Sequence, residues 1–220
     1  MDSIDHPAPC SAWSLHAAEL VAPLLGDLQS WPETPTVDRM VAEGYLHRLL
    51  PGRFAPPDVL DSALRRALLL GAAIGTELRR HHVIAGDSAL WVLLGGPPPS
   101  PAEMLTTAHR SPLAGVRVRH AGLSARDVET VGGAPVTSPV RTAMDLLRFG
   151  SHEVVEQVRE LLEAGHVTEA QVDRALLLLP HQYRVRTARL RLMQAGGGLR
   201  PHEAESGSEA ETCLPSAVTR

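Results

Sequence analysis

Glycine and proline divide this chain into short segments, and that division constrains the fold more than any other feature of the sequence. The 220 residues include 18 glycines and 18 prolines. The longest apolar runs, at residues 67–74 and 89–94, are far shorter than the roughly 20 residues that span a bilayer. A chain of this length forms one or two domains. We therefore expect an α+β protein of short helices and strands, without a membrane span and located in the cytoplasm.

Residues 15–57 follow the order helix, helix, hairpin. Ser14 is a suitable N-cap for the first helix, and residues 36–43 predict a second helix that ends at a glycine, a residue type common at helix ends. A Pro-Gly pair at residues 51–52 predicts a turn between two short strands. This order is the outline of a winged helix. We expect residues 1–14, ahead of this unit, to be disordered.

Residues 58–137 mix helical and strand patterns. Apolar residues recur at helical spacing after Asp58, a suitable N-cap, and place Arg65 and Arg66 on the solvent side of the predicted helix. Residues 116–120 alternate like a half-buried strand, and a Gly-Gly pair predicts a hairpin between two further short strands. We predict an α+β domain with a small sheet in this part of the chain.

Residues 138–195 give the clearest helical signals. Thr168 and Gln171 have the spacing of a capping box at a helix start. Residues 184–194 predict a further helix, although their alternation of arginine with apolar residues also fits a strand. We expect a helical subdomain over residues 138–195, followed by a disordered acidic tail over residues 196–220.

The basic residues exclude several classes of enzyme. All 21 of them are arginine, whereas Walker phosphate loops, Schiff-base enzymes, pyridoxal enzymes and protein kinases each need a lysine at a defined place. Cys10 and Cys213 lie near opposite ends of the chain and form no CxxC pair, so neither a zinc site nor a disulfide framework is indicated. The net charge of -4 gives no overall basic field.

No combination of residues in the sequence indicates catalysis or metal binding. His81 and His82 are adjacent, so on a helix or strand they point apart, and we interpret them as a polar pair at the edge of the middle domain. Residues 86–88 match half of a nucleophile elbow, but Ser88 is better explained as a helix cap or a buried serine. We predict a protein that is not an enzyme, with no catalytic residues, no metal site and no cofactor.

The remaining functional signal is DNA binding. In a winged helix, one helix enters the major groove while the wing touches the phosphate backbone. The contacts expected on that outline are Thr34, Thr36, Arg39 and Arg53. Residues 1–57, however, contain three arginines and seven acidic residues, a local charge of -4 that opposes phosphate binding. The residues leave two interpretations open: a DNA-binding winged helix, or a small helical cap that only packs against the middle domain.

A run of arginines near the C-terminus is a concentrated basic feature. Its members are Arg184, Arg186, Arg189, Arg191 and Arg200. No acidic residue occurs between Asp173 and Glu203. We interpret the run as a solvated face that acidic residues elsewhere balance in space.

Three stretches together resemble actinobacterial proteins of the AbiEi type, the antitoxin half of type IV toxin–antitoxin systems. Residues 37–54 (VDRMVAEGYLHRLLPGRF) resemble the end of that family's winged helix and its wing. Residues 83–95 (VIAGDSALWVLLG) resemble one of its helices. Residues 135–147 (PVTSPVRTAMDLL) are similar to its most specific signature. The resemblance extends over residues 20–195.

The resemblance implies an N-terminal winged helix that binds double-stranded DNA at the promoter of its own operon. It also implies a C-terminal antitoxin domain that counteracts a nucleotidyltransferase toxin without forming a stable complex with it. The DNA contacts expected from the outline and the resemblance together are Thr36, Arg39, Arg48 and Arg53. Arg141 and Asp145 of the signature lie one helical turn apart, and we interpret them as an i,i+4 structural link.

Residues 205–214 resemble the opening of a restriction-like nuclease domain that many relatives of this type carry. The later carboxylates and lysine that would hold a metal there are absent, so we expect a relative truncated before that domain and inactive as a nuclease. The sequence therefore predicts a non-enzymatic, DNA-binding transcriptional regulator of the antitoxin type. The alternative is a degenerate remnant or protein-interaction module that does not bind DNA.

Overall fold

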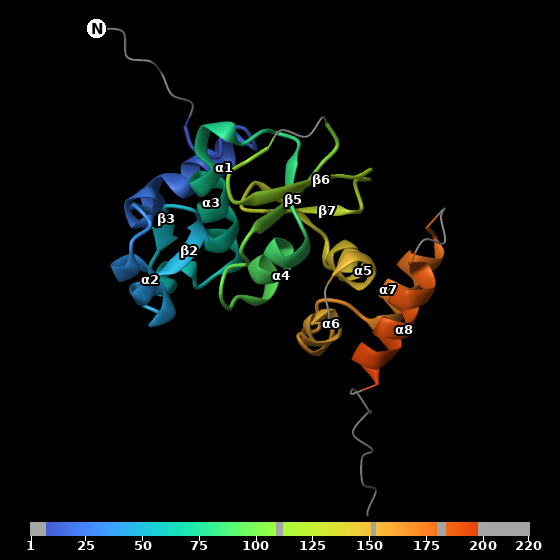
Figure 1. Cartoon of the computed structure of the whole chain (residues 1–220). Helices are drawn as coiled ribbons and strands as arrows, with labels where there is room; N and C mark the ends of the chain where they lie inside the picture. Colours follow the sequence, from blue (N-terminus) through green and yellow to red (C-terminus); the bar gives the residue numbers. More distant parts are fainter. Residues whose placement is uncertain (1–7, 109–111, 151–152, 180–183, 198–220) are drawn as a thin grey trace, which may run out of the picture.

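The structure is a computed structural model, and it describes residues 8–108, 112–150, 153–179 and 184–197 of the chain. Figure 1 shows its parts in chain order: a small N-terminal sheet with its helices at one side, a larger sheet in the middle, and four helices at the other side. The α+β class expected from the sequence is confirmed, because the described residues form helices and two sheets.

The N-terminal part combines two short helices with a three-stranded antiparallel sheet. Its elements are α1 (Leu15–Val21), the 3-10 helix η1 (Ala22–Asp27), β1 (Gln29–Ser30), α2 (Pro35–Ala42), β2 (His47–Leu50) and β3 (Arg53–Ala55). The strand order is β1-β3-β2. The predicted Ser14 cap is confirmed, because its hydroxyl accepts a hydrogen bond from the Ala17 amide at 2.9 Å. The predicted hairpin is confirmed by the pairing of β2 with β3.

Helix α3 is buried along most of its length. It follows η2 (Pro57–Leu60) and precedes η3 (Gly75–Glu77), and it spans Ala63–Ile74. Its residues from Arg66 to Ile74 are all buried. Ser62 caps the helix through its hydroxyl, whereas Asp58, the expected cap, lies in the first turn of η2.

The expected exposure of Arg66 is wrong. Its side chain is buried, with 8% of the residue exposed, and its guanidinium donates to the Val92 and Leu60 carbonyls at 2.9–3.2 Å. Val92 lies near the end of the next helix, where carbonyls lack intrahelical partners. A guanidinium offers five donors, so Arg66 can satisfy carbonyls of both segments. Arg65, in contrast, is partly exposed and pairs with Asp61.

The larger sheet has five strands of mixed direction. The middle elements are β4 (His82–Ile84), α4 (Gly86–Leu94), β5 (Ala102–Thr106), β6 (Val116–His120), β7 (Val128–Val131) and β8 (Ala134–Thr137). The strand order is β6-β5-β4-β8-β7, in which β4 with β8 and β5 with β6 are parallel pairs. The predicted strand over 116–120 and the predicted Gly-Gly hairpin are both confirmed.

The two faces of this sheet have different surroundings. Ala102 and Met104 of β5 belong to the main hydrophobic core, together with residues of α3 and α4. Because successive strand residues point to opposite faces, Glu103 lies on the other face. There it pairs in register with Arg117 of β6. Charged side chains therefore gather on the face opposite the main core.

Four helices complete the described chain and share a second core. They are α5 (Pro139–Phe149), α6 (Val154–Glu163), α7 (Glu169–Leu177) and α8 (Val185–Gly196). The capping box of Thr168 and Gln171 is confirmed. Residues 185–196 are helical, which decides between the two patterns that their sequence allowed. The predicted acidic tail lies, from residue 198 onward, outside the described residues.

The arginine run of α8 does not form one continuous basic face. Arg189 pairs with Asp173 at 2.6 Å, as expected for a face balanced by acidic residues elsewhere. Arg191, in contrast, reaches the Leu147 carbonyl near the end of α5 at 2.9 Å. Arg186 is exposed, and Arg200 lies outside the described residues. The run therefore contributes to packing between helices as well as to the surface.

Part of the segment expected to be disordered packs into the core. Residues 1–7 lie outside the described residues, but Cys10 is only 2% exposed and its thiol donates to the Leu68 carbonyl at 3.4 Å. The Trp13 indole donates to the His82 carbonyl at 2.9 Å. These contacts tie the start of the described chain to α3 and to the larger sheet.

In the part of the chain that the structure describes, no helix combines the length and the apolar character needed to cross a membrane.

The close approach of the N-terminal segment to α3 requires a glycine at position 71, so we predict that Gly71→Ala destabilises the protein. A β-carbon there would meet the Trp13 ring and the Cys10 sulfur. We expect a loss of about 1–3 kcal/mol from overpacking, which exceeds the gain in helix propensity of about 1 kcal/mol.

Denaturant unfolding of the two single variants tests this expectation. Gly26→Ala is the matched control, because a β-carbon at that position would meet no neighbouring atom and its backbone has no positive φ. We expect the control to stay within about 0.5 kcal/mol of the unchanged chain. Equal stability of both variants would contradict the packing of residues 10–13 on α3.

Burial makes the Cys10 thiol unreactive in the folded protein. It raises the pKa of Cys10 to about 12, and the thiolate is the nucleophilic form. In a Cys213→Ser variant at pH 8, we expect native Cys10 to react with Ellman's reagent at least about a hundredfold more slowly than after unfolding in urea. If Cys10 reacted almost as fast in the native protein as in the unfolded one, residues 10–13 would not be packed against α3.

Candidate nucleic-acid interface

Helix α2 buries one side and exposes the other. Thr34 caps it, with its hydroxyl accepting a hydrogen bond from the Val37 amide at 3.3 Å, and Pro35 occupies the first turn. Val37 packs with Leu46 and Phe54 in a small cluster of its own. The helix is therefore held on the hairpin by its buried side, while its opposite side faces solvent.

Two of the expected contacts lie on the exposed side of α2. Thr36 and Arg39 are both exposed, and they are three residues apart, so they share a face of the helix. The Arg39 side chain makes no hydrogen bond or ion pair with any other described residue. Its charge is available to an anion.

Arg48, in contrast, acts as a brace between the hairpin and α2. Its guanidinium pairs with Glu33 at 2.8 Å and with Asp38 at 2.5 Å. It also lies over the Phe54 ring, 5.6 Å from the ring centroid. Burial works against its charge, but the hydrogen bonds to Asp38 and Glu33 raise the pKa of Arg48 overall. Two carboxylates thus already engage Nη2 of the guanidinium that the sequence interpretation assigned to DNA.

The tip of the hairpin is fixed by the same acidic residue. The Gly52 amide donates to Glu33 Oε1 at 2.8 Å, and Gly52 has a φ of +69°, which glycine adopts without strain. Arg53, next to the tip, is exposed and donates to the Ser30 hydroxyl of β1. The four expected residues therefore belong to one small unit, but only Thr36, Arg39 and Arg53 are exposed on it.

The charges of α2 and the hairpin balance each other, although residues 1–57 as a whole have a net charge of -4. Between residues 33 and 55, the arginines are Arg39, Arg48 and Arg53, and the acidic residues are Glu33, Asp38 and Glu43. Three positive and three negative charges leave no net field to attract a phosphate backbone. Any phosphate contact must come from individual side chains, of which Arg39 and Arg53 are the exposed ones.

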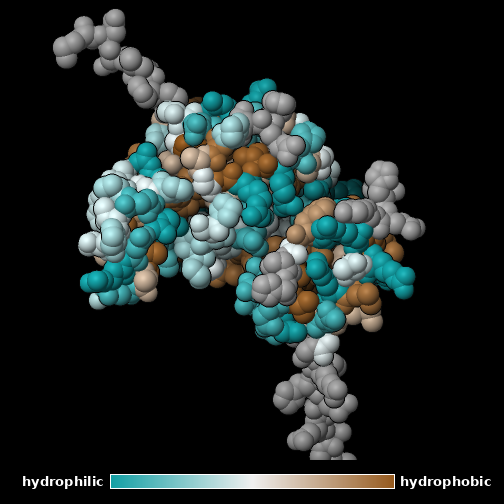
Figure 2. Space-filling model, viewed as in Figure 1, coloured by the Kyte–Doolittle hydropathy of each residue, from teal (hydrophilic) through white to brown (hydrophobic). Residues whose placement is uncertain are grey.

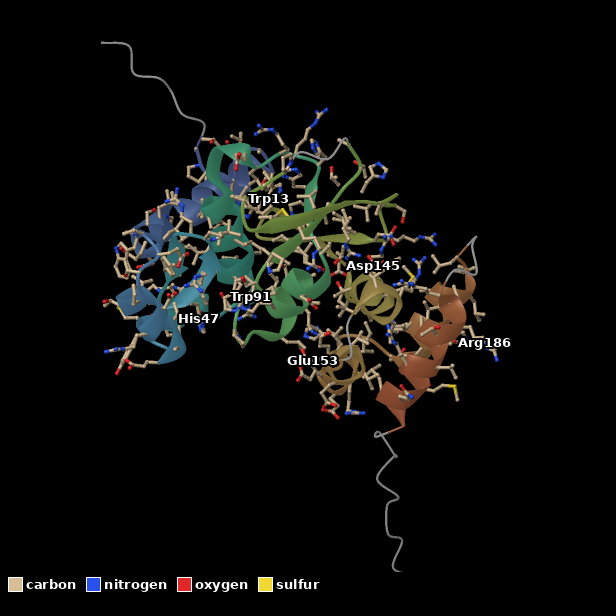
Figure 3. All side chains as sticks on the ribbon, in the orientation of Figure 1. Trp13, His47, Trp91, Asp145, Glu153 and Arg186 are labelled. Atoms are coloured by element: carbon tan, nitrogen blue, oxygen red, sulfur yellow. The ribbon has the colours of Figure 1, made fainter. Side chains whose placement is uncertain are left out.

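A second cluster of arginines, which the sequence interpretation missed, lies between β6 and α5. We name it the arginine pocket and define it by Arg119, Arg141, Asp145, Arg148 and Phe149. These residues line a hollow of about 560 Å³. Figure 3 places Asp145 where α5 approaches the larger sheet, well away from His47 of the N-terminal hairpin.

The Arg141–Asp145 link predicted from the sequence is confirmed. Arg141 Nε donates to Asp145 Oδ2 at 2.8 Å, and a second nitrogen lies 3.5 Å from Asp127. Burial would raise the pKa of Asp127, but the hydrogen bonds from Ser124 and the charge of Arg141 hold it below its usual value. The sequence pattern showed the spacing of Arg141 and Asp145 along the helix. It contained no signal that β6 brings Arg119 to the same place.

The half-match to a nucleophile elbow is structural. Ser88 is fully buried, and its hydroxyl accepts a hydrogen bond from the Glu103 amide at 2.8 Å. Gly86 has a φ of +54°, and the Glu103 carboxylate occupies the space that a side chain there would need. The expectation of a buried serine is confirmed.

The histidine pair differs from its expected position. His82 lies in β4, the central strand, and is 1% exposed, so it is not at an edge of the domain. Its Nδ1 accepts a hydrogen bond from the Arg79 amide at 3.3 Å, and burial lowers its pKa. Among the residues that the structure describes, no group of three or more histidine, cysteine or acidic side chains is arranged to hold a metal ion.

Comparison with known proteins gives no family for this chain: no family model matches it, and no curated protein matches it.

Proposed function

We propose that this chain is a non-enzymatic, DNA-binding transcriptional regulator of the antitoxin type, which binds the promoter of its own operon and counteracts a nucleotidyltransferase toxin. The observation that carries the DNA-binding part is the pairing of an exposed helix face, with Thr36 and Arg39, with a neighbouring hairpin that exposes Arg53. The antitoxin part rests on the resemblance of residues 37–54, 83–95 and 135–147 to AbiEi-type proteins.

The arrangement of α2 and the hairpin supports a winged-helix interpretation of this unit. The three strands have the order β1-β3-β2, and the β2–β3 hairpin follows α2 directly. In such a unit the helix enters the major groove, which is about 12 Å wide, and the hairpin touches the backbone. Thr36 and Arg39 then face base edges and phosphates, and Arg53 contacts the backbone from the wing.

Arg48 has a different part in this proposal. Because it pairs with Glu33 and Asp38, it fixes the angle between α2 and the hairpin instead of contacting phosphate. The proposed contact set is therefore Thr36, Arg39 and Arg53, with Arg48 as a positioning residue. Two cationic contacts imply modest affinity and a shallow dependence on salt.

A second candidate function is a protein-interaction module without DNA binding. The observation that favours it is apolar surface on α7 and α8, part of which is seen in brown in Figure 2. The exposed side chains there are Leu177, Leu178, Leu190 and Met193. Such a patch on a protein surface commonly marks a contact with another protein. The balanced charge around α2 also agrees with this alternative.

DNA binding measured by fluorescence anisotropy separates the two functions. With a duplex from upstream of the gene and an excess of random competitor, we expect competitor-resistant binding with a log K against log salt slope near -2, as two phosphate contacts give. The Arg39→Gln, Arg53→Gln double variant should bind at least about tenfold more weakly, with a slope closer to zero by about 2.

Arg65→Gln is the matched control, because Arg65 is a partly exposed arginine that pairs with Asp61 on α3, outside the proposed interface. Its affinity for the duplex should stay within about twofold of the unchanged chain. Absence of binding by the unchanged chain at about 50 mM salt would refute the DNA-binding proposal and favour the interaction module.

A further inference from the structure

The arginine pocket gathers cations from segments that are distant in sequence. Arg119 comes from β6, while Arg141 and Arg148 lie two turns apart on α5. Ala121 and Gly122 also line the hollow, and the Gly122 carbonyl accepts a hydrogen bond from Arg141 at 3.3 Å. A volume of about 560 Å³ lies within the range of roughly 300–1,000 Å³ that small-molecule sites occupy.

The pocket has more positive charge than its own carboxylates balance. Asp145 is the acidic residue that lines it beside the three arginines, and Arg141 already pairs with that carboxylate and with Asp127. Arg119 lies 3.5 Å from Glu103, which is engaged at 2.6 Å by Arg117. Arg148 forms no ion pair with any residue in the described part of the chain. Among the described residues, the Arg148 guanidinium therefore lacks a counter-ion, and that of Arg119 shares Glu103 with Arg117.

Unsatisfied polar atoms concentrate at the same place. Four buried side-chain nitrogen or oxygen atoms of the described residues lack a hydrogen-bond partner, and two of them are the Nε donors of Arg119 and Arg148. The other two are Arg48 Nε in the N-terminal hairpin and Asp145 Oδ1, an acceptor that an anion does not satisfy. Buried polar atoms are nearly always hydrogen-bonded, so such a concentration calls for a specific explanation. One such explanation is that a bound ligand supplies the missing hydrogen-bond partners.

Phe149 holds the arginines around the hollow. The guanidinium carbons of Arg148 and Arg119 lie 4.6 and 5.6 Å from the centroid of its ring, and that of Arg184 lies at 5.9 Å. Cation–π contacts of this kind fix the position of side chains that are otherwise flexible. Cations gathered on one ring repel each other, and an anion between them removes that repulsion. Burial lowers the pKa of Arg148, and the charge of Arg141 lowers it further, although Asp145 opposes both.

Guanidinium groups match a tetrahedral oxyanion, because each presents a fork of donors to two oxygens at once. We propose that the arginine pocket binds the phosphate group of a small phosphorylated ligand, with Arg119 and Arg148 as donors, while Arg141, which already pairs with Asp145 and Asp127, adds its charge beside them. These arginines line a partly open hollow rather than a convex surface, which favours a small ligand over a duplex, whose phosphates lie on a convex surface. Asp145 is a positioning residue that keeps Arg141 in place.

Titration calorimetry with inorganic phosphate and with AMP, in a chloride buffer of constant ionic strength, tests the proposal. We expect saturable binding of both, with AMP at least as tight as phosphate. Arg148→Gln should raise the dissociation constant at least tenfold. The dissociation constant of Arg148→Lys should lie between those of the unchanged chain and Arg148→Gln, because an ammonium keeps the positive charge but loses the paired donors of the guanidinium.

Two matched substitutions serve as controls. Arg174→Gln on α7 changes an exposed arginine outside the pocket, so its phosphate affinity should stay within about twofold. Arg39→Gln should leave phosphate binding unchanged, while Arg148→Gln should leave duplex binding unchanged, so the pocket and the DNA interface are tested separately. The melting temperature of each variant in chloride alone shows whether it folds.

Three outcomes would overturn the proposal. The first is the absence of saturable binding of both phosphate and AMP to the folded protein. The second is an unchanged affinity in folded Arg148→Gln. The third is displacement of bound AMP by a DNA duplex together with weaker duplex binding of Arg148→Gln, which would assign the arginines to nucleic acid instead.

Discussion

The burial of α3 is the constraint on which the rest of the structure depends. A helix that is apolar around most of its circumference must be covered from several directions. In this chain α1 and the N-terminal segment cover α3 on one side, and β7, β8 and α4 cover it elsewhere. The small N-terminal sheet and the larger sheet are thereby fixed to one shared core. Gly71 allows the closest of these approaches, since the Trp13 ring occupies the place of a side chain there.

Arginine has a role in this fold that extends beyond surface charge. Guanidinium groups from other elements reach the last carbonyls of three helices: Arg66 at α4, Arg191 at α5 and Arg159 at α8. Those carbonyls lack intrahelical partners, and cations near them also interact favourably with the helix dipole. Five donors on a planar group make arginine suited to the task. In this chain without lysine, arginine side chains thus satisfy the last carbonyls of these three helices.

Local features of the fold were predictable from the sequence, and tertiary ones were not. The capping box of Thr168 and the Gly-Gly hairpin depend on residues close in sequence, so their patterns were sufficient. The position of His82 in a central strand depends on β5 and β8 pairing on either side of it. Arg66 follows the periodicity of an exposed residue, but α4 ends beside it and supplies carbonyls. The spacing of residues along the sequence does not show that these strands lie beside His82 or that the end of α4 lies beside Arg66.

The same distinction applies to the sites. The i,i+4 spacing of Arg141 and Asp145 was enough to predict their ion pair, because both lie on one helix. The pocket around them also needs Arg119, which arrives through the parallel pairing of β5 with β6. For Arg48 the wing position suggested a DNA contact, and the sequence contained no signal that Glu33 and Asp38 pair with its guanidinium. Which charges are already paired is decided by tertiary structure.

The availability of charge is the reason that we propose different ligands for the two arginine-bearing regions. Around α2 the arginines are few, the exposed ones are Arg39 and Arg53, and acidic residues balance the unit. In the proposed complex, a surface of this kind would contact an extended polyanion at isolated points, and sequence preference would come mainly from shape and from side chains such as Thr36. In the arginine pocket the cations line a partly open hollow and outnumber the carboxylate beside them. A hollow of this shape fits a single phosphate group, which gains from several donors at once, better than it fits the convex backbone of a duplex.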